Sequence, residues 1–333
     1  MHRLIVLTDG TGKDGNDGGG RTNVNLLQDF LKNGDNQTVN YFPGLGTRDS
    51  ETWTGKIFGK HIYRVISEQY RWIIRAVKNL GIDTDTEIEF ALFGFSRGAF
   101  ISRVLADVLL KCGIPVGDSI APKEMIDWYK KGSLLNIAEW RKRNPKGTLN
   151  ANISFIGVWD TVTSAKGFDD SQWMSVPQEV GMARHAVAIN ENRHMFNYTP
   201  MTAAENVREL FFGGCHSDVG GGYDDNSVLA RIALYWMVSE AKDAGVLFDE
   251  IPAEITEGEF IKACPHSEQN DESNLLWKDK PIMRHIDLSR LHSSVNLLPW
   301  RVLLDDGSPV ESETLVAMAN QVYDRVTSTT MIA

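Results

Sequence analysis

The amino-acid sequence predicts an α/β fold in which helices cover both faces of a mostly parallel central sheet. Short apolar runs alternate along the chain with longer stretches whose apolar residues recur at helical spacing. Such alternation is typical of parallel strands joined by helical crossovers. Polar and glycine-containing segments follow the carboxyl ends of the apolar runs, which is where open parallel sheets bind ligands.

Five apolar runs of strand length are expected to form the sheet. They are Leu4–Leu7, Val39–Phe42, Ile88–Phe93, Ile153–Trp159 and Val207–Phe212. The third run is apolar at nearly every position, as in a strand that is buried on both faces. Helices are expected at Val24–Leu31, Ile62–Leu80, Ala99–Leu110 and Val228–Ala244.

The composition is that of a globular protein, with 42% hydrophobic and 23% charged residues among 333. The formal net charge is −10 and no long basic run occurs, which argues against a nucleic-acid partner. The three cysteines, Cys112, Cys215 and Cys264, form no Cys-x-x-Cys pair, so a reducing compartment is the default. The first apolar run is too short for a signal peptide, and no run reaches the ~20 residues of a membrane-spanning helix. We therefore expect a cytoplasmic protein.

The stretch Gly94-Phe95-Ser96-Arg97-Gly98 has the G-x-S-x-G pattern and lies between an expected strand and an expected helix. In that setting hydrolases place a nucleophilic serine on a sharp turn, and glycines relieve the crowding of its backbone. The alternative is that Ser96 caps the following helix, as serine often does. The two glycines and the buried strand favour the nucleophile.

Two further polar residues directly follow expected strands or come shortly after them. Asp160 follows the fourth run and His216 comes soon after the fifth. Because the carboxyl ends of parallel strands meet at one edge of a sheet, we expect Ser96, Asp160 and His216 to converge there. Their order along the chain, Ser, Asp, His, is that of α/β-hydrolases. The predicted fold class is therefore α/β-hydrolase-like.

Other roles and other residues compete with this assignment. Asp160 could be a turn residue, and His216 could be a packed histidine. His292, in "SRLHSSV", is the rival base, because the histidine of such a triad can also come late in a chain. Asp218 is the rival acid and Asp9 is a further candidate, although we expect Asp9 to shape its glycine-rich loop.

A converging trio of this kind would perform acyl transfer. His216 would take the proton of the Ser96 hydroxyl and later protonate the leaving group. Asp160 would hold the imidazole in the right tautomer and stabilise its charged form. The oxyanion would be bound by the backbone N–H of Arg97 and by a second N–H from Gly10 or Thr11, after the first strand.

Seven short motifs follow one another along the chain. They are "LTDGTGKDG", "TNV", "YFPGLGT", "GFSRGAF", "GVWDTV", "ARHAVAINENR" and "GCHSDVGGGY". The series resembles the α/β-hydrolase-like domain of the type VI secretion lipase effectors, the first family of those phospholipases. The resemblance covers about Leu4 to Phe248. Residue by residue, it implies Ser96 as nucleophile, Asp160 as acid and His216 as base.

The resemblance also implies a substrate class and partners. Members of this family include antibacterial phospholipases that cleave acyl chains from glycerophospholipids, so a lipid or ester substrate is implied. Delivery by type VI secretion and an immunity or secretion partner are implied in the same way. The related effectors usually carry a large additional membrane-associated region, whereas only residues 250–333 remain here beyond the motifs. The reaction class therefore carries over more safely than the lipid substrate.

We expect residues 1–250 to form the catalytic domain and residues 251–333 to form a C-terminal extension packed on it. Two long intervals, at about 115–149 and 164–206, are expected as cap insertions over the catalytic edge. The first places aromatic residues beside basic ones, in "EMIDWYKKGSLLNIAEWRKR". This would suit an interfacial helix on anionic lipid, but we favour a cap helix packed on the core with a solvated basic face. Arg97 and Arg103 could bind a phosphate or carboxylate, or form ion pairs within the fold.

Two other functions stay open: a soluble carboxylesterase for small esters, and a non-catalytic scaffold on a hydrolase fold. A metal-dependent phosphatase is disfavoured because Leu7 stands where the motif suggested by "LIVLTDGTG" needs its nucleophilic aspartate. A calcium-binding EF-hand is rejected because Asn25 replaces glutamate at the twelfth position of the loop that would begin at Asp14. We expect no metal and no cofactor.

Overall fold

The computed structural model describes most of the chain up to residue 249 and a few residues beyond it. The described residues are 1–10, 20–34, 36–44, 55–83, 88–116, 122–145, 147–163, 174–193, 196–223, 228–249, 266, 284, 290, 291, 302, 303, 309 and 310. Thr11, Cys264 and His292, which the sequence analysis named, lie outside the described residues.

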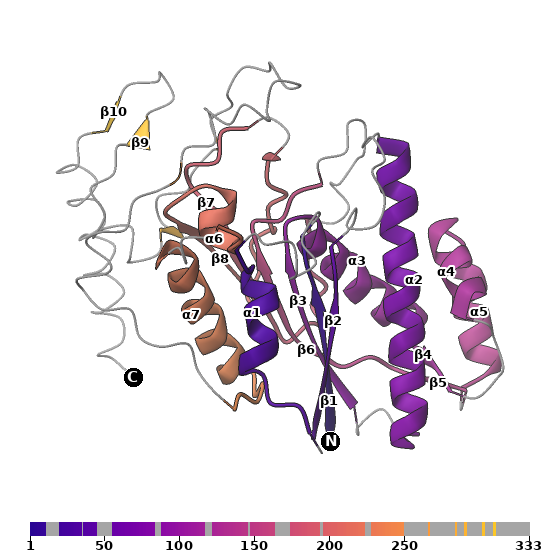
Figure 1. The fold of residues 1–333 in the computed structure, drawn as a ribbon. Coiled ribbons are helices and arrows are strands. Elements are labelled where there is room, and N and C mark those ends of the chain that lie inside the picture. The colour runs from indigo at the N-terminus through magenta and orange to yellow at the C-terminus, as the bar shows by residue number, and fades with distance from the viewer. Residues whose placement is uncertain are drawn as a thin grey trace.

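A six-stranded central sheet has the order β2-β1-β3-β6-β7-β8 (Figure 1). Every neighbouring pair of these strands is parallel. The strands are β1 (His2–Thr8), β2 (Gln37–Phe42), β3 (Ile88–Phe95), β6 (Ile153–Trp159), β7 (Met182–Ala188) and β8 (Val207–Phe212). From β1 the chain adds β2 on one side and then crosses to β3 on the other, and ligands bind at such a switch in strand order. The predicted α/β-hydrolase-like fold class is confirmed.

All five expected strands are present, but strand β7 was not expected. It lies within the interval 164–206, which the sequence analysis treated as an insertion, so that part of the expectation is wrong. Its sequence, MARHAVA, includes Arg184 and His185 and so lacks a continuous apolar pattern. Both side chains have partners outside the strand: Arg184 pairs with Glu240 of α7 (Val228–Asp243), and His185 pairs with Glu209, which lies opposite it on the neighbouring strand β8. Their burial therefore depends on tertiary contacts that a local pattern does not contain.

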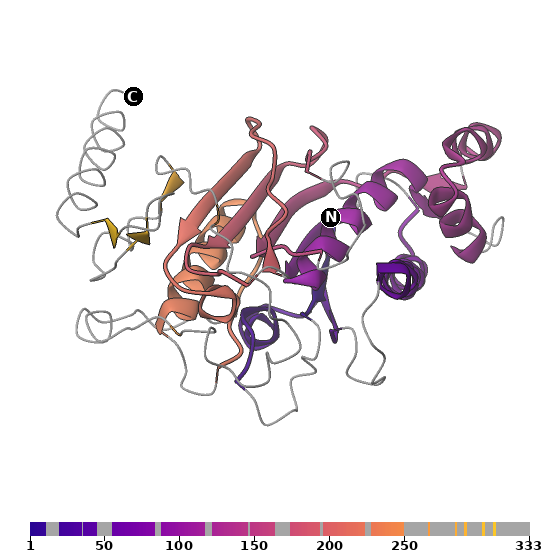
Figure 2. The ribbon, with the colours of Figure 1, turned by 90° about the horizontal axis from the view of Figure 1, so that it is seen from above.

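Helices cover both faces of the sheet (Figure 2). One face carries α1 (Asn23–Phe30) and α7 (Val228–Asp243), and the other carries α2 (Gly55–Leu80) and α3 (Arg97–Cys112). The start of α1 is fixed by Thr22, whose side chain accepts a hydrogen bond from the backbone N–H of Asn25 at 3.0 Å. The four expected helices are thus present.

Alternate residues of β1 face opposite layers of the core. Leu4 and Val6 pack in the layer with α2 and α3, whereas Ile5 and Leu7 pack in the layer with α1 and α7. All four side chains are fully buried. Burial on both faces explains why the strand is a continuous apolar run in the sequence.

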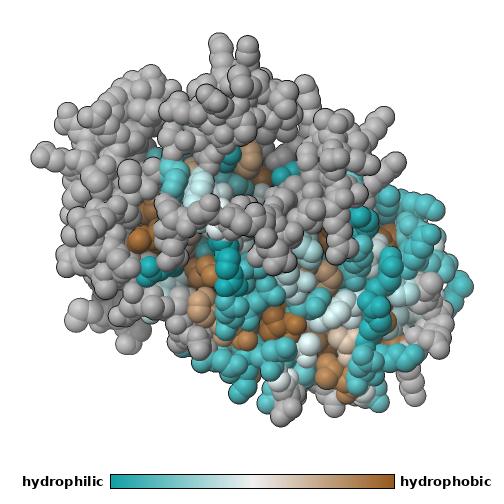
Figure 3. All heavy atoms as spheres, viewed as in Figure 1, coloured by the Kyte–Doolittle hydropathy of each residue, from teal (hydrophilic) through white to brown (hydrophobic). Residues whose placement is uncertain are grey.

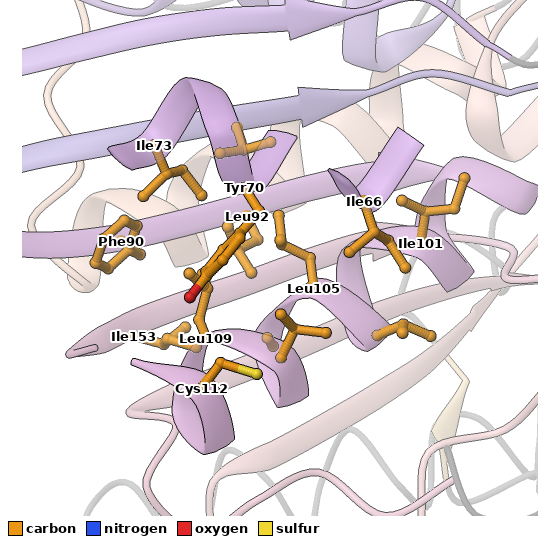
Figure 4. Close-up of a cluster of buried hydrophobic side chains, with 14 of the residues drawn as sticks. Ile66, Tyr70, Ile73, Phe90, Leu92, Ile101, Leu105, Leu109, Cys112 and Ile153 are labelled. Carbon is orange, nitrogen blue, oxygen red and sulfur yellow. The ribbon is translucent and has the colours of Figure 1, made fainter. Parts of the chain in front are cut away.

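The α2/α3 layer holds helix α3 firmly against strand β3 (Figure 4). Tyr70 from α2 lies among apolar side chains that include Leu92 from β3 and Leu105 from α3. Its buried hydroxyl donates to the backbone oxygen of Gly113 at 2.7 Å, so no polar group is left unsatisfied at its tip. This packing fixes the turn between β3 and α3, where Ser96 lies.

The first expected cap insertion packs beside the α2/α3 layer. Its helices α4 (Pro122–Lys130) and α5 (Leu134–Arg143) contact α2 and α3 and lie beyond α2, at the side of the sheet (Figures 1 and 2). Two short strands, β4 (Ile114–Pro115) and β5 (Thr148–Leu149), pair antiparallel where the insertion leaves and rejoins the core. The role of this segment as a cap, and the domain boundaries, stay predictions.

In the C-terminal part, two more short strands, β9 (Val302–Leu303) and β10 (Pro309–Val310), pair antiparallel.

Among the helices that the structure describes, none is both long and apolar enough to cross a lipid bilayer. On the face seen in Figure 3, the described surface is mostly hydrophilic, with small hydrophobic patches between the polar side chains.

Candidate active site

Ser96 occupies a strained turn between β3 and α3. Its backbone has φ 59° and ψ −125°, a region that residues other than glycine rarely adopt. The Ser96 side chain makes no capping hydrogen bond to α3, so Ser96 does not act as a side-chain cap of this helix. A sharp turn with positive φ lifts the hydroxyl away from the helix and toward the sheet edge.

The two glycines around Ser96 are required by close backbone contacts. A Cβ added to Gly94 would lie 2.5 Å from the backbone oxygen of Gly98. A Cβ on Gly98 would overlap the backbone oxygen of Thr8, at the end of β1. Both positions are therefore closed to any larger residue, which gives a physical reason for the G-x-S-x-G spacing.

Asp160 follows the last residue of β6 and is fully buried, with φ 38°. Its Oδ1 accepts from the backbone N–H of Ala188 at 2.9 Å and from Arg284 at 2.6 Å. Its Oδ2 lies 2.6 Å from Nδ1 of His216. Burial alone would raise the pKa of Asp160, but the Arg284 guanidinium and the bond to His216 outweigh it and hold that pKa well below its ordinary value.

His216 connects the other two residues of the predicted trio. It is the first residue of the short helix α6 (His216–Gly220), just after β8, and its Nε2 lies 2.8 Å from Oγ of Ser96. An ionised carboxylate can only accept hydrogen bonds, so Nδ1 of His216 carries the proton and donates a hydrogen bond to Asp160. Nε2 is then unprotonated and accepts a hydrogen bond from the Ser96 hydroxyl. The structure thus brings Ser96, His216 and Asp160 together in one hydrogen-bonded chain.

Two aromatic rings hold the imidazole of His216 in place. The ring centroid of Phe95 lies 4.5 Å from it, and that of Phe196 lies 4.8 Å from it in an edge-on arrangement. The backbone N–H of His216 donates to Glu191 at 3.2 Å. Burial lowers the pKa of His216 below its ordinary value, and the bond and charge of Asp160 offset part of this effect.

The rival residues have other partners where they are described. Asp218 accepts a hydrogen bond from the backbone N–H of Cys215 at 3.0 Å and lies 2.6 Å from Nδ1 of His266. Its carboxylate is therefore engaged by groups other than the imidazole of His216. Asp9 accepts from the hydroxyls of Thr22 at 2.6 Å and Tyr41 at 2.7 Å. The interpretation of Asp9 as a residue that shapes its own loop fits these bonds.

The two described residues that were expected to supply oxyanion donors, Arg97 and Gly10, differ in how their backbone N–H groups are engaged. Arg97 is the first residue of α3, where backbone N–H groups point out of a helix rather than into it. A Cβ on Gly10 would lie 3.3 Å from that of Ser96, so the backbone after β1 passes directly beside the serine. However, the N–H of Gly10 donates to Oδ1 of Asp9 at 2.6 Å, which engages the donor that the sequence analysis assigned to the oxyanion.

The arginines considered for phosphate binding differ in their surroundings. Arg103 donates to the backbone oxygens of Thr199 at 2.7 Å and Pro200 at 2.9 Å, and it is buried. Its bonds therefore lie within the fold, and they attach the segment after β7 to helix α3. Arg97, beside Ser96, is half-buried.

Several contributors to the site were missed by sequence reasoning. Arg284 carries no motif and lies far from any expected element, yet it contacts Asp160. The buried pair of His185 and Glu209, 2.8 Å apart, is a second case. Nε2 of His185 accepts from the backbone N–H of Thr161 at 3.0 Å, so this pair fixes the chain next to Asp160. Among the described residues, no group of three or more His, Cys, Asp or Glu side chains is placed to hold a metal ion.

The fold and the hydrogen-bonded trio at the strand ends define an α/β-hydrolase-like protein. The sequence family described as "T6SS, Phospholipase effector Tle1-like, catalytic domain" matches residues 2–240. The chain belongs to this family of type VI secretion phospholipase effectors, as the seven motifs predicted.

Individual relatives are distant. An uncharacterized protein from Saccharomyces cerevisiae is 25% identical over 217 residues, covering 57% of this chain and 31% of the relative. An uncharacterized protein from Pseudomonas aeruginosa has a similar structure, with a TM-score of 0.49, 18% identity, and coverage of 78% of this chain and 48% of that one. The Tle1 effector bound to the VgrG spike from the type 6 secretion system gives a TM-score of 0.42, 18% identity, and coverage of 69% and 52%. This chain spans about a third of the curated relative and about half of each solved chain.

Proposed function

We propose that this chain is a serine ester hydrolase that cleaves the acyl esters of phospholipids through a covalent acyl-enzyme on Ser96. The observation that carries the proposal is the continuous hydrogen-bonded chain from Ser96 through His216 to Asp160. Its setting supports the same conclusion, because the serine sits on a strained turn at the carboxyl edge of a parallel sheet. Membership of a family of phospholipase effectors supports the substrate class.

The first half of the reaction forms the acyl-enzyme. Oγ of Ser96 attacks the ester carbonyl carbon while its proton passes to Nε2 of His216. The charge that develops on the carbonyl oxygen is stabilised by the backbone N–H of Arg97, at the positive end of helix α3. The imidazolium then gives its proton to the leaving alcohol oxygen, which breaks the ester bond and leaves the acyl group on Ser96.

The second half repeats the same steps with water. His216 takes a proton from a water molecule, whose oxygen attacks the acyl carbonyl carbon. The proton returns to Oγ of Ser96 as the fatty acid departs, so the enzyme is restored without any net change. Asp160 stays ionised throughout and stabilises the imidazolium in both halves.

Activity should fall on the acidic side as His216 takes up a proton. The base must be neutral to accept the serine proton, and burial lowers the pKa of His216 below its ordinary value. We therefore expect the acidic limb of the kcat/KM profile to lie below about pH 6.5. The profile is measured with a soluble ester at constant ionic strength. An acidic limb well above that value would show that His216 is not the buried base described above.

Lipid analysis separates the proposed phospholipase from the two alternatives. Mixed phospholipid vesicles are incubated with the wild type and with the Ser96→Ala variant, and the products are identified by mass spectrometry. Free fatty acid and lysophospholipid formed only by the wild type support the proposal. High activity on short soluble esters with untouched vesicles would instead identify a carboxylesterase. A folded protein inactive on both substrates would favour a scaffold.

We also propose that the corner between α4 and α5 contacts an anionic lipid surface. Leu134 and Leu135 are 43% and 80% exposed, beside the exposed Lys130 and Lys131. The aromatic side chains that first suggested an interfacial helix, among them Tyr129, instead pack toward the core. Exposed leucines flanked by lysines can insert between anionic headgroups while the ammonium groups pair with them.

Replacing both corner leucines, Leu134→Ser with Leu135→Ser, should weaken binding to anionic phosphatidylglycerol vesicles by roughly tenfold or more. The reason is the loss of the apolar area that enters the lipid. The measurement is vesicle co-sedimentation, and the matched control is Leu80→Ser, at the end of α2, where the leucine is 41% exposed. Equal binding by the wild type and the double variant, or an equal loss with Leu80→Ser, would contradict this contact.

Delivery and partners follow from the family rather than from the geometry. Membership of a type VI secretion effector family supports delivery through that system. The related Tle1 effector was solved bound to a VgrG spike, and a spike or immunity partner is the corresponding proposal for this chain. Co-purification of the full chain with candidate spike proteins of its own source would test it.

A further inference from the structure

Arg284 reaches the predicted catalytic acid from a part of the chain beyond the matched family region, which ends at residue 240. Its guanidinium donates to Oδ1 of Asp160 at 2.6 Å and to Oδ2 at 3.1 Å. Both side chains are completely buried. The same guanidinium donates to the backbone oxygens of Ala188, at 2.9 Å, and Phe196. Arg284 therefore ties the acid to the end of β7 and to the segment that follows it.

Both oxygens of the Asp160 carboxylate are fully hydrogen-bonded. Arg284 donates to both of its oxygens, Ala188 donates to one, and His216 contacts the other. A buried carboxylate is stable in its ionised form only when charge and hydrogen bonds compensate its lost hydration. The planar guanidinium of an arginine supplies both the positive charge and the hydrogen bonds, and its geometry fixes the orientation of the carboxylate.

The charges of the group explain what Arg284 adds to a serine hydrolase site. With Arg284 positive, Asp160 negative and His216 neutral, the buried group has no net charge, and His216 stays ready to accept a proton. Without the guanidinium, the same pocket would hold an uncompensated carboxylate beside an imidazole. Proton uptake by either of them would then relieve the unpaired charge, so the pair would bind a proton at a higher pH.

Other charged groups around the pair do not replace Arg284. Glu191 faces the backbone of His216, but it bonds Arg193 at 2.7 Å, so their opposite charges largely cancel. The ring of Tyr198 lies beside the guanidinium, 5.3 Å from it, and burial raises the pKa of Tyr198 to about 12, so this hydroxyl stays neutral. Arg284 is thus the cation that touches the acid within the described part of the chain.

We propose that Arg284 is a positioning residue that keeps Asp160 ionised and correctly oriented while His216 remains unprotonated at rest. The inference rests on the proposed function, because it concerns the same three residues. It also brings one residue from the segment beyond residue 240, Arg284, into the active site. The contact of His266 with Asp218 brings a second residue of that segment to the strand ends.

The test compares the pH profiles of kcat/KM for a soluble ester between about pH 5 and about pH 9. In Arg284→Gln the acidic limb should move up by about one pH unit, because loss of the guanidinium lets the pair take up a proton more easily. Arg284→Lys keeps the charge, so its limb should stay within about half a unit of the wild type while the plateau falls. A role confined to folding would lower the plateau without moving the limb.

The control is Arg290→Gln, which removes a cation from the same segment. Arg290 pairs with Glu209 at 3.2 Å and does not touch Asp160, so its limb should match that of the wild type. An unmoved limb in a folded Arg284→Gln variant, or a full-unit shift in Arg290→Gln, would overturn the inference. If Arg284→Gln does not fold, Arg284→Lys decides, because a limb displaced by a full unit despite the retained charge would contradict it.

A Ser96→Ala variant in the same assay separates the two levels of the proposal. If Ser96→Ala is inactive and the Arg284→Gln limb is unmoved, the proposed function stands and the inference fails. If Ser96→Ala remains active, the proposed function itself fails.

Discussion

Replacing Ser96 with alanine should lower kcat by roughly 10⁴-fold or more and leave the fold intact. The hydroxyl is the group that attacks the ester in the proposed mechanism, and it lies 2.8 Å from the base. Its removal leaves only substrate binding and oxyanion stabilisation to accelerate the reaction. Because Ser96 makes no capping bond to α3, alanine removes no structural contact of the helix. The measurement is turnover of phospholipid vesicles, with thermal unfolding as the check on folding.

The matched control is Ser102→Ala, on the same helix. The hydroxyl of Ser102 is buried and donates to the backbone oxygen of Phe93 at 2.9 Å, so its loss affects packing and not the reaction. We expect this variant to keep most of its turnover. His216→Ala should lose as much activity as Ser96→Ala, and retained activity in His216→Ala with a loss in His292→Ala would transfer the role of base to His292.

Replacing Asp160 with asparagine should lower kcat on the order of 10⁴-fold. A neutral amide cannot stabilise the imidazolium, and its N–H₂ group can present a donor to Nδ1 of His216 and so favour the wrong tautomer. The change also leaves the buried guanidinium of Arg284 without its anion, so thermal stability should fall together with activity. Turnover and melting temperature are measured on the same preparation.

Asp218→Asn is the control that distinguishes the two candidate acids. Asp218 contacts Cys215 and His266, so its loss should disturb local structure but leave the acid of the reaction in place. Nearly normal turnover in Asp160→Asn, together with a severe loss in Asp218→Asn, would move the acid role to Asp218.

The sequence predicted the parts of the fold and site that local pattern determines. Strands such as β1 and β3 are buried on both faces, so their apolar runs are continuous and easy to recognise. Ser96, Asp160 and His216 each come at, or shortly after, the end of a strand, and a parallel sheet brings such ends to one edge. Their convergence could therefore be expected from their positions alone.

What the sequence did not predict depends on contacts between distant segments. Strand β7 carries Arg184 and His185, whose burial depends on Glu240, which pairs with the guanidinium, and on Glu209, which bonds the imidazole. Arg284 contacts Asp160 across 124 positions of sequence, and nothing in its own neighbourhood indicates that partner. The hydrogen bond from the N–H of Gly10 to the side chain of Asp9 was missed for a different reason. The backbone N–H of a loop residue can point either toward a substrate or toward the side chain of a neighbouring residue.

Labelling with a fluorophosphonate probe shows whether Ser96 is an activated nucleophile, because the probe reacts with a serine only when a neighbouring base activates it. The folded wild type is incubated with the probe, and the modified peptide is identified by mass spectrometry. We expect one phosphonylated residue, Ser96, with labelling strongly reduced in His216→Ala and absent in Ser96→Ala. A folded wild type that remains unlabelled, or that is labelled at another residue, would contradict the role of Ser96 as nucleophile.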